Sequence, residues 1–193
     1  FKDPEYRKKF GIKGKFRIVP LDYGEYDSKK IFDYEEVAIQ TNTTSFKEYL
    51  DLRGIAFFIE SLINGRPFDE FFSYSEQFGI TRTRVIKSLQ DNMSEAPKKV
   101  QDLYKKFIDE TEDELWESEE ELLNYYRKEK NYLKLKKGLI GGNLIYKYKS
   151  ISLLTTSIEW IQFLEKQIFK LVDNDIAFYI ETSELKKQLA NIS

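Results

Sequence analysis

The spacing of hydrophobic residues changes along the chain, and the first forty residues have the spacing of strands. In residues 15–19 apolar and polar side chains alternate, and residues 31–40 again place isoleucine and valine among charged side chains. A period of two is typical of half-buried strands, and two such runs joined by turn-forming residues form a hairpin. We therefore predict an N-terminal β-hairpin in which Pro20 ends the first strand and residues 21–30 form a loop.

From Ser45 onward the apolar residues recur every three or four positions, as they do in amphipathic helices. Ser45 and Glu48 match the capping-box pattern, so a helix is predicted to begin there and to run to about Ile63. Further helices are predicted over residues 68–78, 81–90, 94–116, 118–138 and 144–172, the last with an interruption within residues 150–157. Residues 176–190 fit a helix as well as a strand followed by a helix.

These elements predict a mainly α-helical fold: a multi-helix domain of about six or seven helices with a small N-terminal β-hairpin. We place one boundary after Thr44, so that residues 1–44 form the hairpin and its connecting segment and residues 45–193 form the helical domain. A lone hairpin is only marginally stable in water, so it is expected to pack on helices or on a further part of the protein. Because the sequence opens on Phe1, we interpret it as a piece of a longer polypeptide.

Composition excludes several classes of chemistry. The 193 residues include no cysteine and no histidine. The chain therefore has no thiol nucleophile and no thiolate ligand for an iron–sulfur cluster, and it lacks the commonest zinc ligand and the commonest general base. No pair of carboxylates falls on an apolar face, which disfavours a carboxylate-based enzyme. We predict no catalytic residue and no metal site in this chain.

Charge and hydropathy disfavour two kinds of partner. The 31 basic and 33 acidic residues nearly cancel, giving a formal net charge of -2. A dedicated nucleic-acid-binding domain usually has a basic face, so nucleic acid is not expected as a partner. No apolar run approaches the roughly 20 residues that span a bilayer, and no signal peptide opens the sequence. We expect a cytoplasmic location and no membrane partner.

Two charged runs follow one another in the second half of the chain. Residues 109–121 are strongly acidic, and residues 127–137 are rich in lysine. Acidic side chains suit the start of a helix and basic ones suit its end, because each complements the helix dipole there. The acidic run has no calcium-loop spacing, so we interpret it as a solvated face spanning a helix end and the next helix start. We interpret the basic run as complementing the acidic run and the helix C-terminus, in preference to a phosphate-binding site.

Three further features invite a functional interpretation. Gly141-Gly142-Asn143 precedes a helix but lacks the glycine patterns of nucleotide-binding loops, which favours a tight hinge with a helix cap. Lys147 lies between two tyrosines, a pattern more typical of a core edge than of a nucleic-acid site. Arg53 lies on a helix that becomes fully apolar, and no acidic residue occupies its i+3 or i+4 row. Arg53 should therefore pair with a carboxylate of another segment or with a ligand.

Several segments occur in an order that has a known counterpart. They are Phe10–Ile12, Phe16–Pro20, Tyr23–Asp27, Glu35–Phe46, Arg53, Gly141–Leu144 and Tyr146–Lys149. Together they resemble the region C-terminal to the catalytic barrel in cobalamin-binding radical S-adenosylmethionine (radical SAM) enzymes. Such enzymes carry a cobalamin-binding domain before a barrel that holds a 4Fe-4S cluster on three cysteines. Since this chain has no cysteine, the resemblance transfers none of those cluster residues to it.

The resemblance implies a non-catalytic C-terminal accessory domain that shapes substrate access or packs on the barrel of its parent enzyme. The 4Fe-4S cluster, S-adenosylmethionine and cobalamin would belong to the parent, and the partners would be upstream domains of the same polypeptide, joined at residues 1–44. The candidates for a binding site or domain interface are Asn42, Arg53, Asn143 and Lys147. The alternative is a helical protein-interaction module with no enzymatic role, using the acidic run and an exposed aromatic face.

Overall fold

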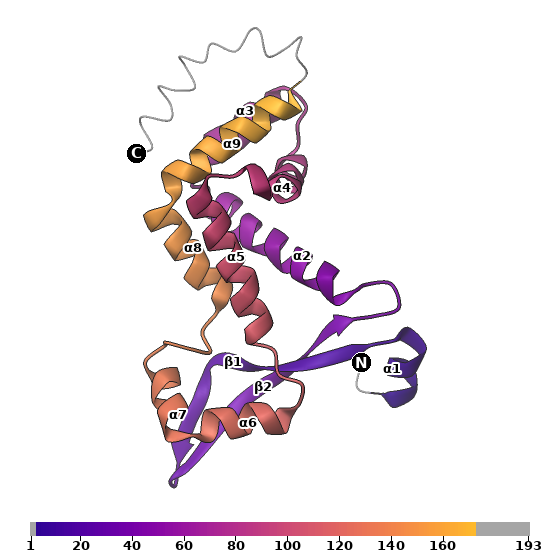
Figure 1. Ribbon diagram of the computed structural model, residues 1–193, viewed down its shortest axis with the longest axis vertical. Helices are drawn as coiled ribbons and strands as arrows, with labels where there is room; N and C mark the ends of the chain where they lie inside the picture. The colour runs from indigo at the N-terminus through magenta and orange to yellow at the C-terminus, as the bar shows by residue number, and fades with distance from the viewer. Residues whose placement is uncertain (1–2, 173–193) are drawn as a thin grey trace. The chain divides into compact units, whose positions relative to one another are not determined.

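The structure, a computed structural model, describes residues 3–172. In that range nine α-helices, one short π-helix and one short 3-10 helix accompany a two-stranded antiparallel sheet (Figure 1). The mainly α-helical fold with an N-terminal hairpin is therefore confirmed. More α-helices form than the expected six or seven, because a short helix precedes the hairpin and two of the predicted helices are interrupted, at Lys128 and at Thr156. Residues 176–190, which fit a helix as well as a strand followed by a helix, lie outside the described range.

The chain divides into two compact units. Unit 1 joins the residues up to Arg53 with Phe107–Lys147, and unit 2 joins Gly54–Lys106 with the residues from Tyr148 onward. This division differs from the expected boundary after Thr44, because a segment from the middle of the chain folds on the hairpin. No hydrophobic period marks such a discontinuous unit in the sequence.

The hairpin of unit 1 is longer than the sequence indicated. Helix α1 (Pro4–Phe10) precedes strand β1 (Lys13–Tyr26), which pairs with strand β2 (Lys29–Gln40). The predicted loop over residues 21–30 is instead two strand ends joined by Asp27 and Ser28, which have φ angles of 48° and 58°. Positive φ angles at both positions are typical of the tight hairpin turn whose twist matches the strands.

Pro20 does not end strand β1, contrary to the prediction. The pairing register shifts between Ile18 and Tyr23, so Pro20 lies in an irregular stretch of the ladder. A proline lacks the N–H that a regular ladder needs, but a bulge leaves that position unpaired and therefore tolerates it.

Helices α6 (Glu119–Arg127) and α7 (Glu129–Lys136) lie against the hairpin (Figure 1). The buried residues that form the core between them are Ile18, Phe32, Leu122, Tyr126, Tyr132 and Leu135. The Tyr23 hydroxyl donates a hydrogen bond of 2.9 Å to the carbonyl oxygen of Leu135 at the end of α7. The hairpin thus packs on helices, as a two-stranded sheet must.

Helix α2 (Phe46–Phe58) begins as predicted at a capping box and continues as a π-helix (Ile59–Ile63). The Ser45 N–H donates to Glu48 Oε2 at 2.7 Å, and the Glu48 N–H donates to Ser45 Oγ at 3.2 Å. This reciprocal pair supplies acceptors for two backbone N–H groups at the start of the helix.

Unit 2 contains the apolar end of α2 together with helices from both halves of the chain. These are α3 (Asp69–Gln77), α4 (Arg82–Asp91), most of α5 (Lys98–Asp113), most of α8 (Leu144–Thr155) and α9 (Ser157–Leu171). Its fully buried aromatic residues are Phe57, Phe58, Phe68, Phe72, Tyr148, Trp160 and Phe163. Phe58 meets the Trp160 ring edge to face at a centroid distance of 5.7 Å, which is a favourable aromatic geometry.

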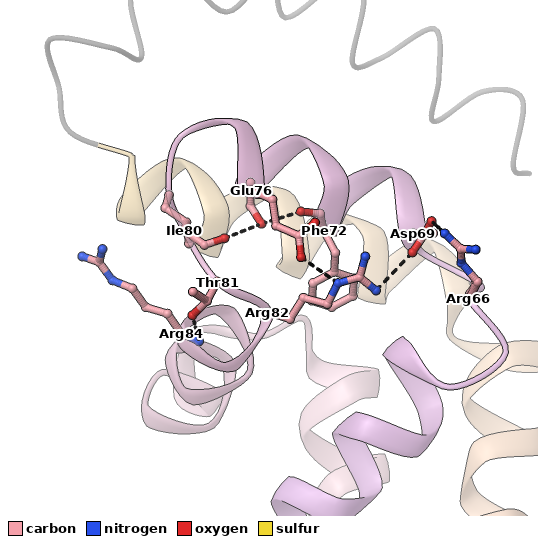
Figure 2. Close-up of polar contacts among 9 residues, drawn as sticks. Arg66, Asp69, Phe72, Glu76, Ile80, Thr81, Arg82 and Arg84 are labelled. Atoms are coloured by element: carbon pink, nitrogen blue, oxygen red, sulfur yellow. Dashed lines mark hydrogen bonds and ion pairs between the residues drawn. The ribbon is translucent and has the colours of Figure 1, made fainter.

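A polar network holds the turn between α3 and α4 in unit 2 (Figure 2). Asp69 in the first turn of α3 accepts from Arg66 at 2.5 Å and pairs with Arg82 at 3.1 Å. The Arg82 Nε–H also donates to Glu76 at 2.8 Å, and its guanidinium lies 5.7 Å from the centre of the Phe72 ring. Every charged side chain drawn in this turn except Arg84 is engaged in an ion pair of the network.

Candidate functional site

Four charged side chains from distant segments of unit 1 meet beside the hairpin. Arg17 on β1 stands opposite Glu35 on β2 in the pairing register, and the two form an ion pair of 2.6 Å. Arg17 also pairs with Glu114, just past the end of α5, at 3.2 Å. Arg53 on α2 approaches the same Glu114 oxygen at 3.8 Å. The expectation that Arg53 pairs with a carboxylate of another segment is therefore met, but only at a distance too long for a hydrogen bond.

Arg53 and Glu114 are largely removed from solvent, which disfavours the charged forms of their side chains. Only 18% of the Arg53 side chain and 20% of the Glu114 side chain are exposed. Desolvation raises the pKa of Glu114, although Arg17 and Arg53 both act to lower it. Desolvation also raises the pKa of Tyr49, which lies one helical turn before Arg53 on α2. At Arg17 the balance is reversed: desolvation acts to lower its pKa, but Glu114 and Glu35 outweigh that effect and raise it. Burial therefore dominates at Glu114 and Tyr49, where a missing hydrogen bond matters most.

A small pocket of about 100 Å³ opens beside this cluster. It is lined by Arg17, Ile18, Pro20, Arg53, Glu114, Gly142, Asn143, Leu144 and Ile145. Asn143 Oδ1 accepts a hydrogen bond of 3.3 Å from the Tyr146 N–H, so Asn143 caps helix α8 as predicted. The pocket therefore combines two guanidinium groups, one mostly buried carboxyl and a carboxamide with the apolar side chains of Ile18, Pro20, Leu144 and Ile145.

Gly141 gives this wall its shape. Its φ angle is 68°, and a β-carbon at that position would lie 2.4 Å from Leu135 Cδ1 and 3.0 Å from Ile18 Cγ2. Glycine is the one residue that adopts this positive φ angle and fits this close approach without strain, because it has no β-carbon. Gly141 thus serves a tight backbone turn against the core of unit 1.

A large pocket of about 420 Å³ adjoins the small one. The two pockets share Glu114 and the segment Gly142–Leu144 as a common wall. The remaining lining of the large pocket is Glu110, Asp113, Trp116, Tyr125, Tyr126, Gly138, Leu139, Ile140, Gly141 and Lys147. Its volume falls within the range of small-molecule sites, which is about 300–1,000 Å³.

Aromatic rings form one side of the large pocket. The Trp116 and Tyr125 rings have a centroid distance of 4.8 Å, and Tyr126 meets Tyr125 edge to face at 5.2 Å. Burial raises the pKa of Tyr126 to about 12, so its hydroxyl stays protonated near neutral pH. Lys147 pairs with Glu110 at 2.6 Å on the other side. The pocket thus presents an aromatic wall and a charged rim.

Three of the four residues singled out from the sequence come together here. Arg53 and Asn143 line the small pocket, and Asn143 and Lys147 line the large one. Asn42 does not join them: its side-chain amide donates to the Lys9 carbonyl at 2.9 Å and ties the end of β2 to helix α1.

Sequence reasoning did not single out Arg17, Glu114, Trp116 or Tyr125. Arg17 fits the ordinary polar position of an alternating strand, and Glu114 lies inside an acidic run that was interpreted as solvated. That interpretation does not hold for Glu114, which is mostly buried, although the neighbouring Glu112 and Asp113 are exposed. The sequence contains no local signal for burial of one acid among many.

A wider depression of about 610 Å³ lies at the turn end of the hairpin. Its lining includes Lys30 and Arg127, but Lys30 Nζ already donates to the Arg127 carbonyl at 3.1 Å and pairs with Glu129 at 2.5 Å. The ammonium group of Lys30 is thus already engaged. The two pockets around Asn143 are the better candidate, because three residues singled out from the sequence line them.

The described part of the chain contains no cluster of acidic residues arranged to hold a metal ion. Over the same residues, no helix is both long enough and apolar enough to cross a membrane. No protein-family model matches the sequence, and no curated protein matches it. The hydrogen-bond donors and aromatic rings that line the two pockets of unit 1 are of the kind that bind small molecules.

Proposed function

We propose that the chain is the non-catalytic C-terminal accessory domain of a cytoplasmic radical SAM enzyme of the cobalamin-binding type. In this proposal its partners are the upstream domains of the same polypeptide, and it shapes substrate access or packs on the barrel. The 4Fe-4S cluster, S-adenosylmethionine and cobalamin belong to the parent enzyme, since this chain has neither cysteine nor histidine.

One observation carries the proposal. The segments that resemble this enzyme family are separated by almost ninety residues between Arg53 and Gly141, yet Phe16–Pro20, Arg53 and Gly141–Leu144 all contribute to the lining of the two adjoining pockets. A shared site gives these segments a reason to meet, because residues that act together must lie together.

The first test examines the parent. The gene sequence upstream of Phe1 should encode a cluster motif of three closely spaced cysteines. The full-length protein should show iron–sulfur absorption and cleave S-adenosylmethionine reductively to 5′-deoxyadenosine, while the 193-residue chain should do neither. An upstream sequence without the cysteine motif, or a cluster bound by the isolated chain, would refute the proposal.

The second test examines the role of this domain in the full-length enzyme. Arg53→Gln and Asn143→Asp should reduce turnover of the physiological substrate while leaving cluster content unchanged. Arg84→Gln is the matched control, because Arg84 is an exposed arginine of unit 2 that lies outside both pockets. Equal turnover in all three variants would argue against a role of this site in substrate access.

The alternative is a helical protein-interaction module that binds a basic partner. It is favoured by the acidic surface of unit 1, where Asp109, Glu112, Asp113, Glu117, Glu119, Glu120 and Glu121 are all exposed. Analytical ultracentrifugation and a pull-down separate the two functions. A stable complex with an unrelated basic protein, retained when the upstream region is deleted, would favour the module over the accessory domain.

A further inference from the structure

Arg53 carries a charged hydrogen-bond donor that lacks an acceptor among the described residues. Within residues 3–172 its Nε–H is buried and has no hydrogen-bond partner. Its ion pair with Glu114 is 3.8 Å long, and the same Glu114 oxygen is 3.2 Å from Arg17. Glu114 therefore forms a closer ion pair with Arg17 than with Arg53.

Such an arrangement is energetically unfavourable. A buried donor without an acceptor costs about 1–3 kcal/mol, and a charged donor costs more. A carboxylate between the Arg53 guanidinium and the Asn143 carboxamide would give the terminal N–H groups of the guanidinium an acceptor, since arginine binds carboxylates through charge-assisted hydrogen bonds. Both side chains line the small pocket, which has room for a group of this size.

The charges around the pocket favour an anion of low charge over a dianion. Arg17 and Arg53 are balanced by Glu35 and Glu114, and Glu114 is part of the wall of both pockets. Because the two arginines are already balanced, a phosphate dianion would bring two uncompensated negative charges next to Glu114, whereas a carboxylate brings one. A carboxylate carries one charge and matches the fork of a guanidinium.

The large pocket supplies room for the rest of the ligand. It continues from the shared wall at Gly142–Leu144 to the rings of Trp116 and Tyr125. These half-buried aromatic walls favour an apolar or aromatic body. We propose that unit 1 binds a small monocarboxylate with an aromatic or apolar body, its carboxylate between Arg53 and Asn143 and its body against Trp116 and Tyr125. This inference does not depend on the identity of the parent enzyme.

Benzoate is a suitable probe, and nitrogen-15 NMR of the 193-residue chain is a suitable readout. Benzoate should shift the Arg53 Nε–Hε signal saturably, together with the indole signal of Trp116. The chain has two tryptophans, so the indole of Trp160 in unit 2 is an internal control that should not move. Benzamide, which is similar in shape and uncharged, should bind at least about tenfold more weakly, a difference of about 1.4 kcal/mol.

Two variants test the assigned contacts. Asn143→Asp keeps an oxygen acceptor for the cap of α8 but places a negative charge at the pocket, so benzoate should bind at least about tenfold more weakly. Arg53→Gln should weaken benzoate binding by a similar factor. If the Arg53 variant does not fold, the benzoate affinity of Asn143→Asp alone tests the assigned contact. Arg84→Gln, in unit 2, should bind benzoate as tightly as the unsubstituted chain does.

Four results would overturn the inference. They are equal binding of benzoate and benzamide, unchanged affinity in Asn143→Asp, a shift at Trp160 in place of Trp116, and inorganic phosphate binding as tightly as benzoate. Each would show that the carboxylate is not recognised between Arg53 and Asn143. None of them bears on the upstream cysteine motif, so this inference and the proposed function fail separately.

Discussion

The hydroxyl of Tyr104 occupies the space beside Gly54 that a side chain would need. A β-carbon on Gly54 would lie 2.2 Å from the Tyr104 hydroxyl oxygen and 3.0 Å from Cζ of the same ring. The Tyr104 ring stacks on Phe58 at a centroid distance of 5.1 Å, so it is held in place by the core of unit 2. Gly54 is therefore a packing residue in the middle of a helix.

We expect Gly54→Ala to destabilise the protein by about 1–3 kcal/mol, even though alanine is the better helix former, because it overpacks this contact. The free energy of unfolding, measured by urea denaturation, checks the value. In a Tyr104→Phe background the same substitution should cost less, since the hydroxyl oxygen is the closest atom. An equal cost in both backgrounds would place the strain elsewhere.

Gly141→Ala should destabilise unit 1, because the new β-carbon would meet Leu135 at 2.4 Å and the φ angle of 68° is unfavourable for alanine. A cost of about 1–3 kcal/mol is expected from overpacking. Gly142→Ala is the matched control: nothing lies within 4 Å of its added β-carbon, and its φ angle is not in the left-handed region. Thermal unfolding of the two variants should separate them clearly, and a similar loss in both would contradict the role assigned to Gly141.

Glu60 should make the stability of unit 2 depend on pH. Lys149 Nζ donates a hydrogen bond of 2.7 Å to Glu60, and this bond lowers the pKa of Glu60 from its ordinary value of 4.5. A carboxyl with a lowered pKa stabilises the folded state above its ordinary pKa and loses that contribution as pH falls through its folded value. The difference in unfolding free energy between the parent sequence and Glu60→Gln should therefore be larger at about pH 7 than at about pH 3. A difference that does not change with pH would exclude this linkage.

Glu114 should show the opposite dependence. Burial raises its pKa above the ordinary value of 4.5, so the folded state binds its proton more tightly than the unfolded chain does. That contribution is fully present below the ordinary pKa and is lost as pH rises through the raised pKa. Relative to Glu114→Gln, the parent sequence should therefore lose stability as pH rises from about 4 toward neutrality, measured by urea denaturation at several pH values. A relative gain over that range would show that Arg17 and Arg53 outweigh desolvation.

Local features of the fold could be predicted from the sequence because they depend on residues a few positions apart. The capping box of Ser45 and Glu48 forms as expected, and the break at Thr156 falls within the predicted interruption. The long helix predicted over residues 118–138 is wrong in one respect, because the chain turns at Lys128 and divides it into α6 and α7. Lys128 has a ψ angle of 128°, which is outside the helical region. No glycine or proline beside it indicates this break in the sequence.

The candidate site could be predicted only in part. Arg53 attracted notice because its own helix offers no carboxylate at i+3 or i+4, and Asn143 because it precedes a helix. The other members of the site are ordinary in sequence. Arg17 is one polar residue of a strand, and Glu114 is one acid in a run of acids, until the fold buries them side by side.

The sequence by itself determined the helical class, the hairpin and the absence of cysteine and histidine chemistry, since periodicity and composition are properties of the chain alone. The tertiary structure alone decided that residues 107–147 join the hairpin, that Glu114 is buried and that Arg53 lacks a close acceptor. Burial and hydrogen-bond satisfaction depend on which distant segments meet. That outcome is set by the summed packing of the whole unit, which no local pattern contains.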